Sequence, residues 1–413
     1  MPNEQTGPEQ VSLEQAMATA MNLHREGQLD VAEKIYRRIL EAVPGYPDGM
    51  HFLGVLLHQR GRPDEALELI RNSISMAPAT ADWHNNLGNV LFEQGEAEDA
   101  CAAYRRALEL DGDLASAHLN MANLLFRSGE VLRAVEHYNH VLRLTPDNYN
   151  ARRMVGISLS TLGHTEAAAE IYRRWMEDEP DNPVARHLYA ACTGQDLPER
   201  AEDRLVEQLF DPFAEYFDEK LERLDYKAPQ LVGEIVARAF EPPDGTLECL
   251  DAGCGTGLCG AFLRPYCRHL TGVDLSSGML EKARPRDCYD ELVKAELTRF
   301  LSACDEQFDL IVSADTLVYF GRLDEVFAAS YSALRPGGLL VFTLEESTAD
   351  DGGDIRLNHH GRYSHRKDYV LTTLHAVGFA ETDLQPAVLR TEAGAPVAGL
   401  LVSVRRPAIS LAS

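Results

Sequence analysis

The first half of the chain places apolar residues at three- and four-residue spacings, in stretches that recur every 34 residues. This spacing is typical of helices with one buried face. A turn-forming glycine recurs with the same period, four residues after a leucine in every copy. The glycines are Gly27, Gly61, Gly95, Gly129 and Gly163. The pattern predicts five helix–turn–helix units that stack into an α-solenoid.

Three further positions of the period support these units. An alanine follows each glycine by five residues, which predicts close approach of the paired helices. A tyrosine or isoleucine comes four residues later, and a proline or glycine then ends the second helix. The pattern resembles the tetratricopeptide repeat. We place the repeat array at 13–193, with units at 13–46, 47–80, 81–114, 115–148 and 149–182 and a capping helix at 183–193.

The resemblance implies that the repeats bind a protein or peptide partner in a concave groove. Asn86 and Asn89 recur one repeat later as Asn120 and Asn123, on the face that usually lines this groove. An asparagine both donates and accepts, so a row of them can hold an extended peptide backbone. The same side chains could instead only satisfy helix ends or water. The array could also serve solely as a dimerisation or docking platform.

From Leu247 onward, short apolar runs alternate with amphipathic stretches. This change of period predicts βα units and a mostly parallel, Rossmann-like sheet. The fold class is therefore α + α/β, a helical solenoid followed by a sheet for which seven strands are expected. The expected strands lie near 248–252, 270–275, 290–297, 308–315, 337–345, 382–389 and 397–406.

A glycine-rich turn follows the first of these strands. Gly255, Gly257 and Gly260 fit the GxGxxG spacing of dinucleotide enzymes, whereas Gly253, Gly255 and Gly257 fit DxGxGxG. The acidic residue Asp251 decides between them, because a carboxylate there would repel a pyrophosphate. It suits a cofactor without phosphate that carries a cationic amino group.

Four segments in a fixed order extend this pattern: DAGCGTG, GVDLSSGML, FDLIVSADTLVY and LRPGGLLVFT. Together they closely resemble the class I methyltransferases, over roughly 202–406, and we place the core at 241–413. The resemblance implies S-adenosylmethionine as the cofactor. It implies that Gly253, Gly255 and Gly257 let the backbone approach the methionine portion.

The remaining cofactor contacts follow from the same resemblance. Asp274 ends the second strand, where its carboxylate can accept both ribose hydroxyls, although it could instead cap the next helix. Glu296 stands where the family commonly has the aspartate that binds the adenine amino group. The other expected contacts are Leu275, Met279, Ala295 and Asp315. No metal site is expected.

The segment 199–240 reads as lid or linker helices. It is similar to a segment that covers the cofactor in methyltransferases of the ubiquinone-biosynthesis type. The matching positions are Phe210, Asp211, Ala214, Phe217 and Asp218, with Tyr216 as the candidate cofactor contact. Because all expected cofactor residues lie beyond Glu199, a chain that begins there is expected to fold and bind cofactor.

The string RLNHHGRYSH follows the fifth expected strand, where class I enzymes commonly build the acceptor site. It holds three histidines, His359, His360 and His365, and His365 is our candidate general base. Arg362 could hold a substrate carboxylate. Tyr319, after the fourth strand, could line the same site.

The net charge of the chain limits the classes of partner that it is expected to bind. The chain has 65 acidic and 39 basic residues, for a net charge of −26. Such a surface repels phosphate backbones and anionic lipid, so neither nucleic acid nor membrane is expected as a partner. The polar N-terminus and the lack of a long apolar run favour the cytoplasm, where the eight cysteines would be free thiols.

Two functions remain open from the sequence. The chain could methylate an O, N or S atom of an acceptor that the repeats recruit or present, and a small-molecule acceptor is not excluded. Alternatively, it could be a non-catalytic scaffold that binds cofactor and works through its repeats. The fold alone does not decide the substrate.

Overall fold

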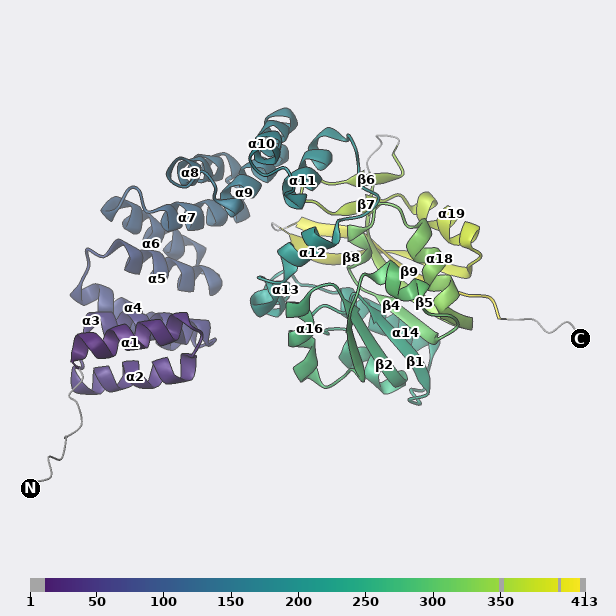
Figure 1. Ribbon diagram of the computed structural model, residues 1–413, viewed down its shortest axis with the longest axis horizontal. Helices are drawn as coiled ribbons and strands as arrows, with labels where there is room; N and C mark the ends of the chain where they lie inside the picture. The colour runs from purple at the N-terminus through teal and green to yellow at the C-terminus, as the bar shows by residue number, and fades with distance from the viewer. Residues whose placement is uncertain (1–11, 349–352, 393–394, 409–413) are drawn as a thin grey trace, which may run out of the picture. The chain divides into compact units, whose positions relative to one another are not determined.

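The computed structural model describes residues 12–348, 353–392 and 395–408. It divides into two compact units, which meet between Leu162 and Gly163 (Figure 1). The first unit is helical throughout, and the second holds the sheet. The boundary falls within the fifth repeat, so the domain limits expected from the sequence stay predictions.

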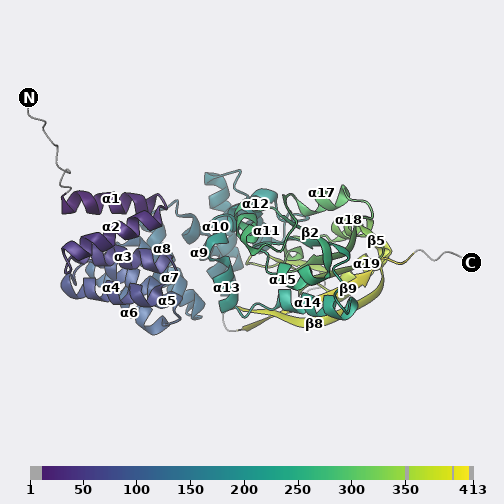
Figure 2. The ribbon, with the colours of Figure 1, turned by 90° about the horizontal axis from the view of Figure 1, so that it is seen from below.

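The first unit consists of consecutive antiparallel helices, seen in Figures 1 and 2. Its helices are α1 (Leu13–Arg25), α2 (Leu29–Ala42), α3 (Pro47–Gln59), α4 (Pro63–Met76), α5 (Ala81–Glu93), α6 (Ala97–Leu110), α7 (Ala115–Arg127), α8 (Val131–Leu144) and α9 (Tyr149–Thr161). Each helix pair is one unit of the 34-residue period.

The repeated residues occupy the positions that the period predicts. The turn glycines have φ between +69° and +84°, which a residue with a side chain rarely adopts. The repeated alanines Ala32, Ala66, Ala100 and Ala134 are fully buried. A Cβ on Gly88 would lie 2.4 Å from the Tyr104 ring, so small and large positions interlock. The repeat prediction is confirmed.

The second unit begins with helices and continues into the sheet. Its first helices are α10 (Thr165–Asp178), α11 (Pro183–Thr193), α12 (Asp203–Phe210), η1 (Ala214–Tyr216), α13 (Phe217–Arg223) and α14 (Ala228–Ala239). Helix α11 ends at Gly194, which is left-handed with φ of +67°.

The sheet has the order β3-β2-β1-β4-β5, and its parallel strands are extended by β9 and β8. The strands are β1 (Leu247–Ala252), β2 (Cys267–Asp274), β3 (Glu291–Lys294), β4 (Phe308–Ser313), β5 (Leu334–Glu346), β6 (Ile355–Leu357), β7 (Tyr363–His365), β8 (Ala380–Glu392) and β9 (Ala395–Arg405). Strand β9 runs antiparallel to β5 and β8. These seven strands confirm the predicted Rossmann-like class. The short β6–β7 hairpin is an addition that raises the count to nine.

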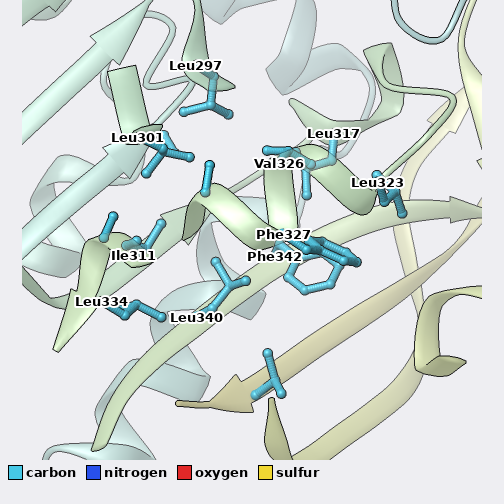
Figure 3. Close-up of a cluster of buried hydrophobic side chains, with 14 of the residues drawn as sticks. Leu297, Leu301, Ile311, Leu317, Leu323, Val326, Phe327, Leu334, Leu340 and Phe342 are labelled. Carbon is cyan, nitrogen blue, oxygen red and sulfur yellow. The ribbon is translucent and has the colours of Figure 1, made fainter. Parts of the chain in front are cut away.

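Apolar side chains cover both faces of the sheet, because successive residues of a strand point in opposite directions. On β4, Ile311 joins one cluster while Leu310 and Val312 join the other. Figure 3 shows the first cluster, in which Phe327 and Phe342 lie 5.2 Å apart between ring centroids. The covering helices are α15 (Gly260–Leu263), α16 (Ser277–Ala283), α17 (Leu297–Ser302), α18 (Asp324–Ala333) and α19 (Lys367–Val377), with α14.

Two buried cysteines differ from the expectation of free thiols. Cys249 on β1 and Cys267 on β2 form a disulfide between neighbouring strands. The prediction was wrong for this pair, because the strand register brings together two cysteines that are 18 residues apart. The other six cysteines, all among the described residues, are not disulfide-bonded.

Candidate cofactor and acceptor site

The predicted cofactor residues meet at the carboxyl ends of three neighbouring strands. Asp251 lies near the end of β1, Asp274 ends β2, and Asp315 follows β4. Strand β1 lies between β2 and β4, so the chain crosses the sheet in opposite directions from this point. Open α/β sheets bind ligands at such a switch point.

Asp251 presents an unsatisfied oxygen at this edge. The carboxylate is 1% exposed, and its Oδ2 accepts a hydrogen bond from the Tyr289 hydroxyl at 2.7 Å. Its Oδ1 is buried without a hydrogen-bond partner among the described residues. Burial raises the pKa of Asp251 to about 7, despite the bond from Tyr289, which lowers it. A buried carboxylate oxygen of this kind fits a cationic amino group.

The glycine-rich loop lies close to its neighbours. Gly253 has φ of +81°, and a Cβ there would lie 2.0 Å from the Thr316 hydroxyl oxygen. Gly255 and Gly257 also have positive φ, +54° and +88°. The amide of Gly255 donates to Asp274 Oδ2 at 2.8 Å, which ties the first loop to the second strand.

The Asp274 side chain is fixed by backbone donors. Besides the Gly255 bond, Oδ1 accepts from the Ser276 amide at 2.8 Å. Ser276, not Asp274, is the N-cap of α16, since its hydroxyl accepts from the Met279 amide. Two bonds use only part of the capacity of a carboxylate, so it can still accept ribose hydroxyls.

We expect Asp274→Ala to weaken binding of S-adenosylhomocysteine while the fold survives. Loss of charge-assisted hydrogen bonds costs on the order of 1.5–3 kcal/mol, or roughly ten- to a hundredfold in affinity. Calorimetry measures the affinity, and thermal unfolding is the control. Unchanged affinity in a folded variant would show that the carboxylate only organises the two loops.

Two of the groups expected to contact adenine already make hydrogen bonds within the protein. The Ala295 amide donates to the Asp274 carbonyl at 3.2 Å, so this donor is not available to a ring nitrogen in this conformation. Glu296 caps α17 by accepting from the amides of Thr298 and Arg299. Met279 is buried, whereas Leu275 is half-buried. Of these four, Leu275 best retains the role expected for it.

The expected lid is tied to both cofactor loops by two aspartates. Asp211 accepts from the Ser276 hydroxyl at 2.5 Å and from the Gly278 amide at 3.2 Å. Asp218 accepts from the Thr256 hydroxyl and forms an ion pair with Arg286. The segment therefore contacts the loops after β1 and after β2.

The candidate residue Tyr216 is 48% exposed. The aromatic contacts of the lid are made instead by Phe210, whose ring lies 5.6 Å from Tyr319 and 6.0 Å from Phe217. Tyr319 belongs to η4 (Leu317–Tyr319), directly after β4. Phe210 thus connects the lid with the expected acceptor side.

Five charged side chains from distant parts of the chain form one network beside Asp315. Arg390 bonds to Asp315 at 2.5 Å, to Glu392 at 2.6 Å and to Glu345. Arg362 bonds to Glu345 at 2.6 Å and to Glu392 at 2.8 Å. Three acids oppose two bases, and Arg362 already holds two carboxylates. The arrangement does not favour the expected role of Arg362 in holding a substrate carboxylate.

The candidate base His365 is fully buried. Its Nε2 lies 2.9 Å from the Gly321 carbonyl oxygen, its ring stacks on Tyr369, and its Nδ1 has no partner among the described residues. Burial lowers the pKa of His365 to about 4. Since neither nitrogen is accessible, this structure disfavours a role as general base.

Two other candidates lie closer to the network. His360 Nε2 is 3.8 Å from Glu345, and burial lowers the pKa of His360 to about 2. Burial raises the pKa of Tyr319 to about 12. At neutral pH the histidine is uncharged and the tyrosine keeps its proton, so both can hydrogen-bond an acceptor but neither is a ready base.

Several residues of this site were missed by the sequence analysis. Tyr289, Arg390 and the bonds of Asp218 emerge only from the fold. One sequence signal existed for Arg390, because its charge directly follows the apolar residues of β8. In the structure this side chain is 3% exposed.

Comparison with known proteins agrees with both halves. Residues 250–342 match a family described as "Methyltransferase domain". Residues 23–88 and 119–183 match families described as "Tetratricopeptide repeat", and residues 88–129 match one described as "TPR repeat". The chain is thus a tetratricopeptide-repeat protein that carries a methyltransferase domain.

Individual proteins are similar to part of this chain. The malonyl-[acyl-carrier protein] O-methyltransferase of Priestia megaterium is 30% identical over 171 residues, 40% of this chain and 57% of that protein. Human methyltransferase-like protein 27 is 33% identical over 147 residues, 34% of this chain and 58% of that protein. The chain spans little more than half the length of these relatives.

Among solved structures, an S-adenosylmethionine-dependent methyltransferase from Mesorhizobium loti is 25% identical, with a TM-score of 0.33. The match covers 42% of this chain and 98% of that one. Within the described residues, no helix is long and apolar enough to cross a membrane. The same part of the chain contains no group of three or more His, Cys, Asp or Glu side chains that could hold a metal ion.

Proposed function

We propose that this protein is an S-adenosylmethionine-dependent methyltransferase that transfers a methyl group to an O, N or S atom of an acceptor. The buried, unsatisfied Oδ1 of Asp251 beside the glycine-rich loop carries the proposal. It fits the amino group of this cofactor, and the match over 250–342 supports the class. A cytoplasmic location remains part of the proposal.

When bound, the cofactor supplies an electrophilic methyl group on a sulfonium. The chain itself would bind and orient this group: Asp251 pairs with the ammonium, the glycines admit the methionine portion, and Asp274 accepts the ribose hydroxyls. The lid aspartates Asp211 and Asp218 hold the cover near both loops and keep water out. Because the leaving group is already good, positioning and desolvation supply most of the catalysis.

The acceptor side favours a nucleophile that needs little help from a base. Tyr319 keeps its proton and His360 stays neutral, so each can position an acceptor atom by a hydrogen bond. The Asp315, Glu345 and Glu392 carboxylates outnumber Arg362 and Arg390, so a further anion would be repelled. An acceptor that is neutral or a hydrogen-bond donor fits this network better than a free carboxylate.

We further propose that the repeats bind a protein or peptide partner that is the acceptor or presents it. Two of the predicted asparagines are linked directly, because Asn120 Nδ2 donates to Asn89 at 2.8 Å and also to Asn85 at 3.0 Å. Asn86 Nδ2 lies 3.0 Å from His51 Nε2. Tyr104 and Tyr138 donate to Asn89 and Asn123. These bonds fix the side chains on the first helices of their repeats, ready to meet an extended backbone.

The alternative is a scaffold that binds cofactor without turnover. The burial of His365 and the protonated state of Tyr319 favour it, because no strong base lies at the acceptor side. A labelled-methyl assay on cell extract, separated into protein and small-molecule fractions, distinguishes the two. Transfer to either fraction supports the enzyme. Binding of S-adenosylhomocysteine without any labelled product supports the scaffold.

Replacing Asn86 and Asn123 by alanine tests the repeat surface. We expect transfer to a protein acceptor to fall by roughly tenfold, as expected for loss of one or two hydrogen bonds of about 1 kcal/mol each. Cofactor affinity should stay unchanged, because its residues lie in the other compact unit. Ser116→Ala, an exposed change on the same repeat helices, is the matched control. Full transfer by the double variant would remove the asparagines from acceptor binding.

A further inference from the structure

Residues 183–202, which we call the brace, pack against the β6–β7 hairpin (Figure 1). In helix α11, His187 Nε2 lies 2.9 Å from the Gly361 carbonyl oxygen at the hairpin turn. The His187 ring also contacts Tyr363 edge-on, at 5.9 Å between centroids. The Tyr363 hydroxyl in turn donates to the Pro198 carbonyl at 2.7 Å. Two points of the brace therefore hold the hairpin.

The same segment holds the loop that follows β4. The Glu199 carbonyl accepts from the amides of Gly321 and Arg322, both at 2.8 Å. The Ala201 amide donates to the Tyr319 carbonyl, also at 2.8 Å. These are backbone bonds, so they fix the path of the loop independently of side-chain identity.

The two loops are also locked to each other. A Cβ on Gly321 would lie 2.8 Å from the Tyr363 ring and 3.1 Å from the Glu199 carbonyl oxygen, so only glycine fits this crossing. His365 bonds to the carbonyl of Gly321 from the other side. This contact gives the buried His365 a structural role that fits its burial better than general-base catalysis.

We propose that His187 is a positioning residue for the acceptor site, and that the brace sets the placement of His360, Arg362 and Tyr319. The inference rests on the proposed methyltransferase function. Gly361 stands between His360 and Arg362 in the chain, so a bond to its carbonyl fixes both neighbours. Pairing with a carbonyl requires the proton on Nε2, and burial keeps the ring neutral by lowering the pKa of His187.

Helix α11 does more than the capping helix predicted from the sequence. A cap only covers the end of a repeat array. Helix α11 instead shares an apolar cluster with the hairpin, made by Ala190, Leu357 and Tyr363. The last helix of the repeat pattern is thus a working part of the catalytic unit.

Three variants of the full chain test the proposal. His187→Ala removes the donor to Gly361. His187→Gln keeps a side-chain donor and serves as the rescue. Arg186→Ala is the control on the same helix, because this side chain is exposed and makes only a long ion pair of 3.7 Å with Glu202. The readouts are S-adenosylhomocysteine affinity, the rate of labelled-methyl transfer at saturating cofactor, and hydrogen exchange of residues 355–365.

We expect His187→Ala to slow transfer by about tenfold or more, since small misplacements near reacting groups have effects of this size. Hydrogen exchange of the hairpin should accelerate. Cofactor affinity should stay within about twofold of the wild-type value, well below the tenfold change that about 1.4 kcal/mol produces. His187→Gln should restore most of the transfer rate, and Arg186→Ala should behave as wild type. If His187→Ala does not fold, Tyr363→Phe removes the second anchor and should give the same pattern.

Unchanged transfer and unchanged hairpin exchange in His187→Ala would overturn the proposal. So would a loss of cofactor affinity that matches the loss of transfer, because it would indicate general damage to the fold. If the wild-type protein binds S-adenosylhomocysteine but transfers no methyl group, the proposed function fails. In that case, hydrogen exchange of residues 355–365 in His187→Ala still tests whether the brace holds the hairpin.

Discussion

A chain that begins at Glu199 should be much less stable than one that begins at Gly163. The shorter chain lacks His187 and Pro198, and it exposes Tyr363, which is 1% exposed in the intact protein. The shorter chain loses two hydrogen bonds of about 1 kcal/mol each. It also loses the burial of Leu357 and Tyr363, which contributes roughly 1.5–3 kcal/mol for each side chain. The sum, on the order of 5 kcal/mol, is comparable with the whole stability of many domains.

Urea denaturation of the two chains measures this difference. The sequence favoured Glu199 as a starting point because the cofactor residues follow it, whereas the contacts of α11 favour an earlier start. A third chain that begins at Pro183 retains the brace and is the matched control. Equal unfolding midpoints for the chains from Glu199 and Pro183 would show that α11 contributes no stability.

Replacing Asp251 by asparagine should give the largest loss of cofactor affinity of any single change described here. The amide is nearly the same size and can still accept the Tyr289 bond, but it cannot pair with an ammonium group. Removing one partner of a buried charge pair costs on the order of 2–5 kcal/mol, which is about thirtyfold or more in affinity. Calorimetry with S-adenosylhomocysteine measures it, and Asp309→Asn, at the other end of the sheet, is the control.

The pH dependence of binding provides a second measure of the same pair. Burial raises the pKa of Asp251 to about 7, so the free protein holds this proton below pH 7. A cationic ligand favours the ionised carboxylate, and binding must then release the proton. Affinity should therefore rise as the pH increases from about 5, which is just above the ordinary carboxyl range, to about 7. Above pH 7 it should stay constant.

Stability should change in the opposite sense. The unfolded chain loses the Asp251 proton near the ordinary aspartate pKa of about 3.9, while the folded protein retains it to about pH 7. Between these values the unfolded state binds fewer protons, so this residue makes folding less favourable as pH rises. Asp251→Asn should abolish both trends, and a wild-type affinity that is flat from pH 5 to 7 would contradict the assignment.

The sequence predicted those features that repeat or that follow one strand. The 34-residue period defined the helix pairs, because burial of one helix face imposes a fixed spacing. Continuous apolar runs marked the sheet strands, because both faces of the sheet are covered. The positions of Asp251 and Asp274 were predictable because each lies at or next to the end of such a run.

The remaining site could not be read in this way. Asp315, Glu345, Arg362, Arg390 and Glu392 span almost 80 positions, and ion pairs between distant segments leave no periodic signal. Among the histidines of the RLNHHGRYSH string, the sequence favoured His365 as the base, because nothing in the string marked it as buried. The hairpin separates them, because one packs behind the Gly321 loop while another lies beside Glu345.

The position of the boundary between the compact units limits how such a protein can change in length. The second compact unit starts at Gly163 and includes α10 and α11. Upstream of that glycine the chain repeats with a period of 34 residues, and each repeat has a left-handed glycine at the turn between its two helices. A change in the number of 34-residue periods before Gly163 would therefore leave the sequence of the second compact unit intact. The final helices are not exchangeable, because the methyltransferase domain depends on them for its own architecture.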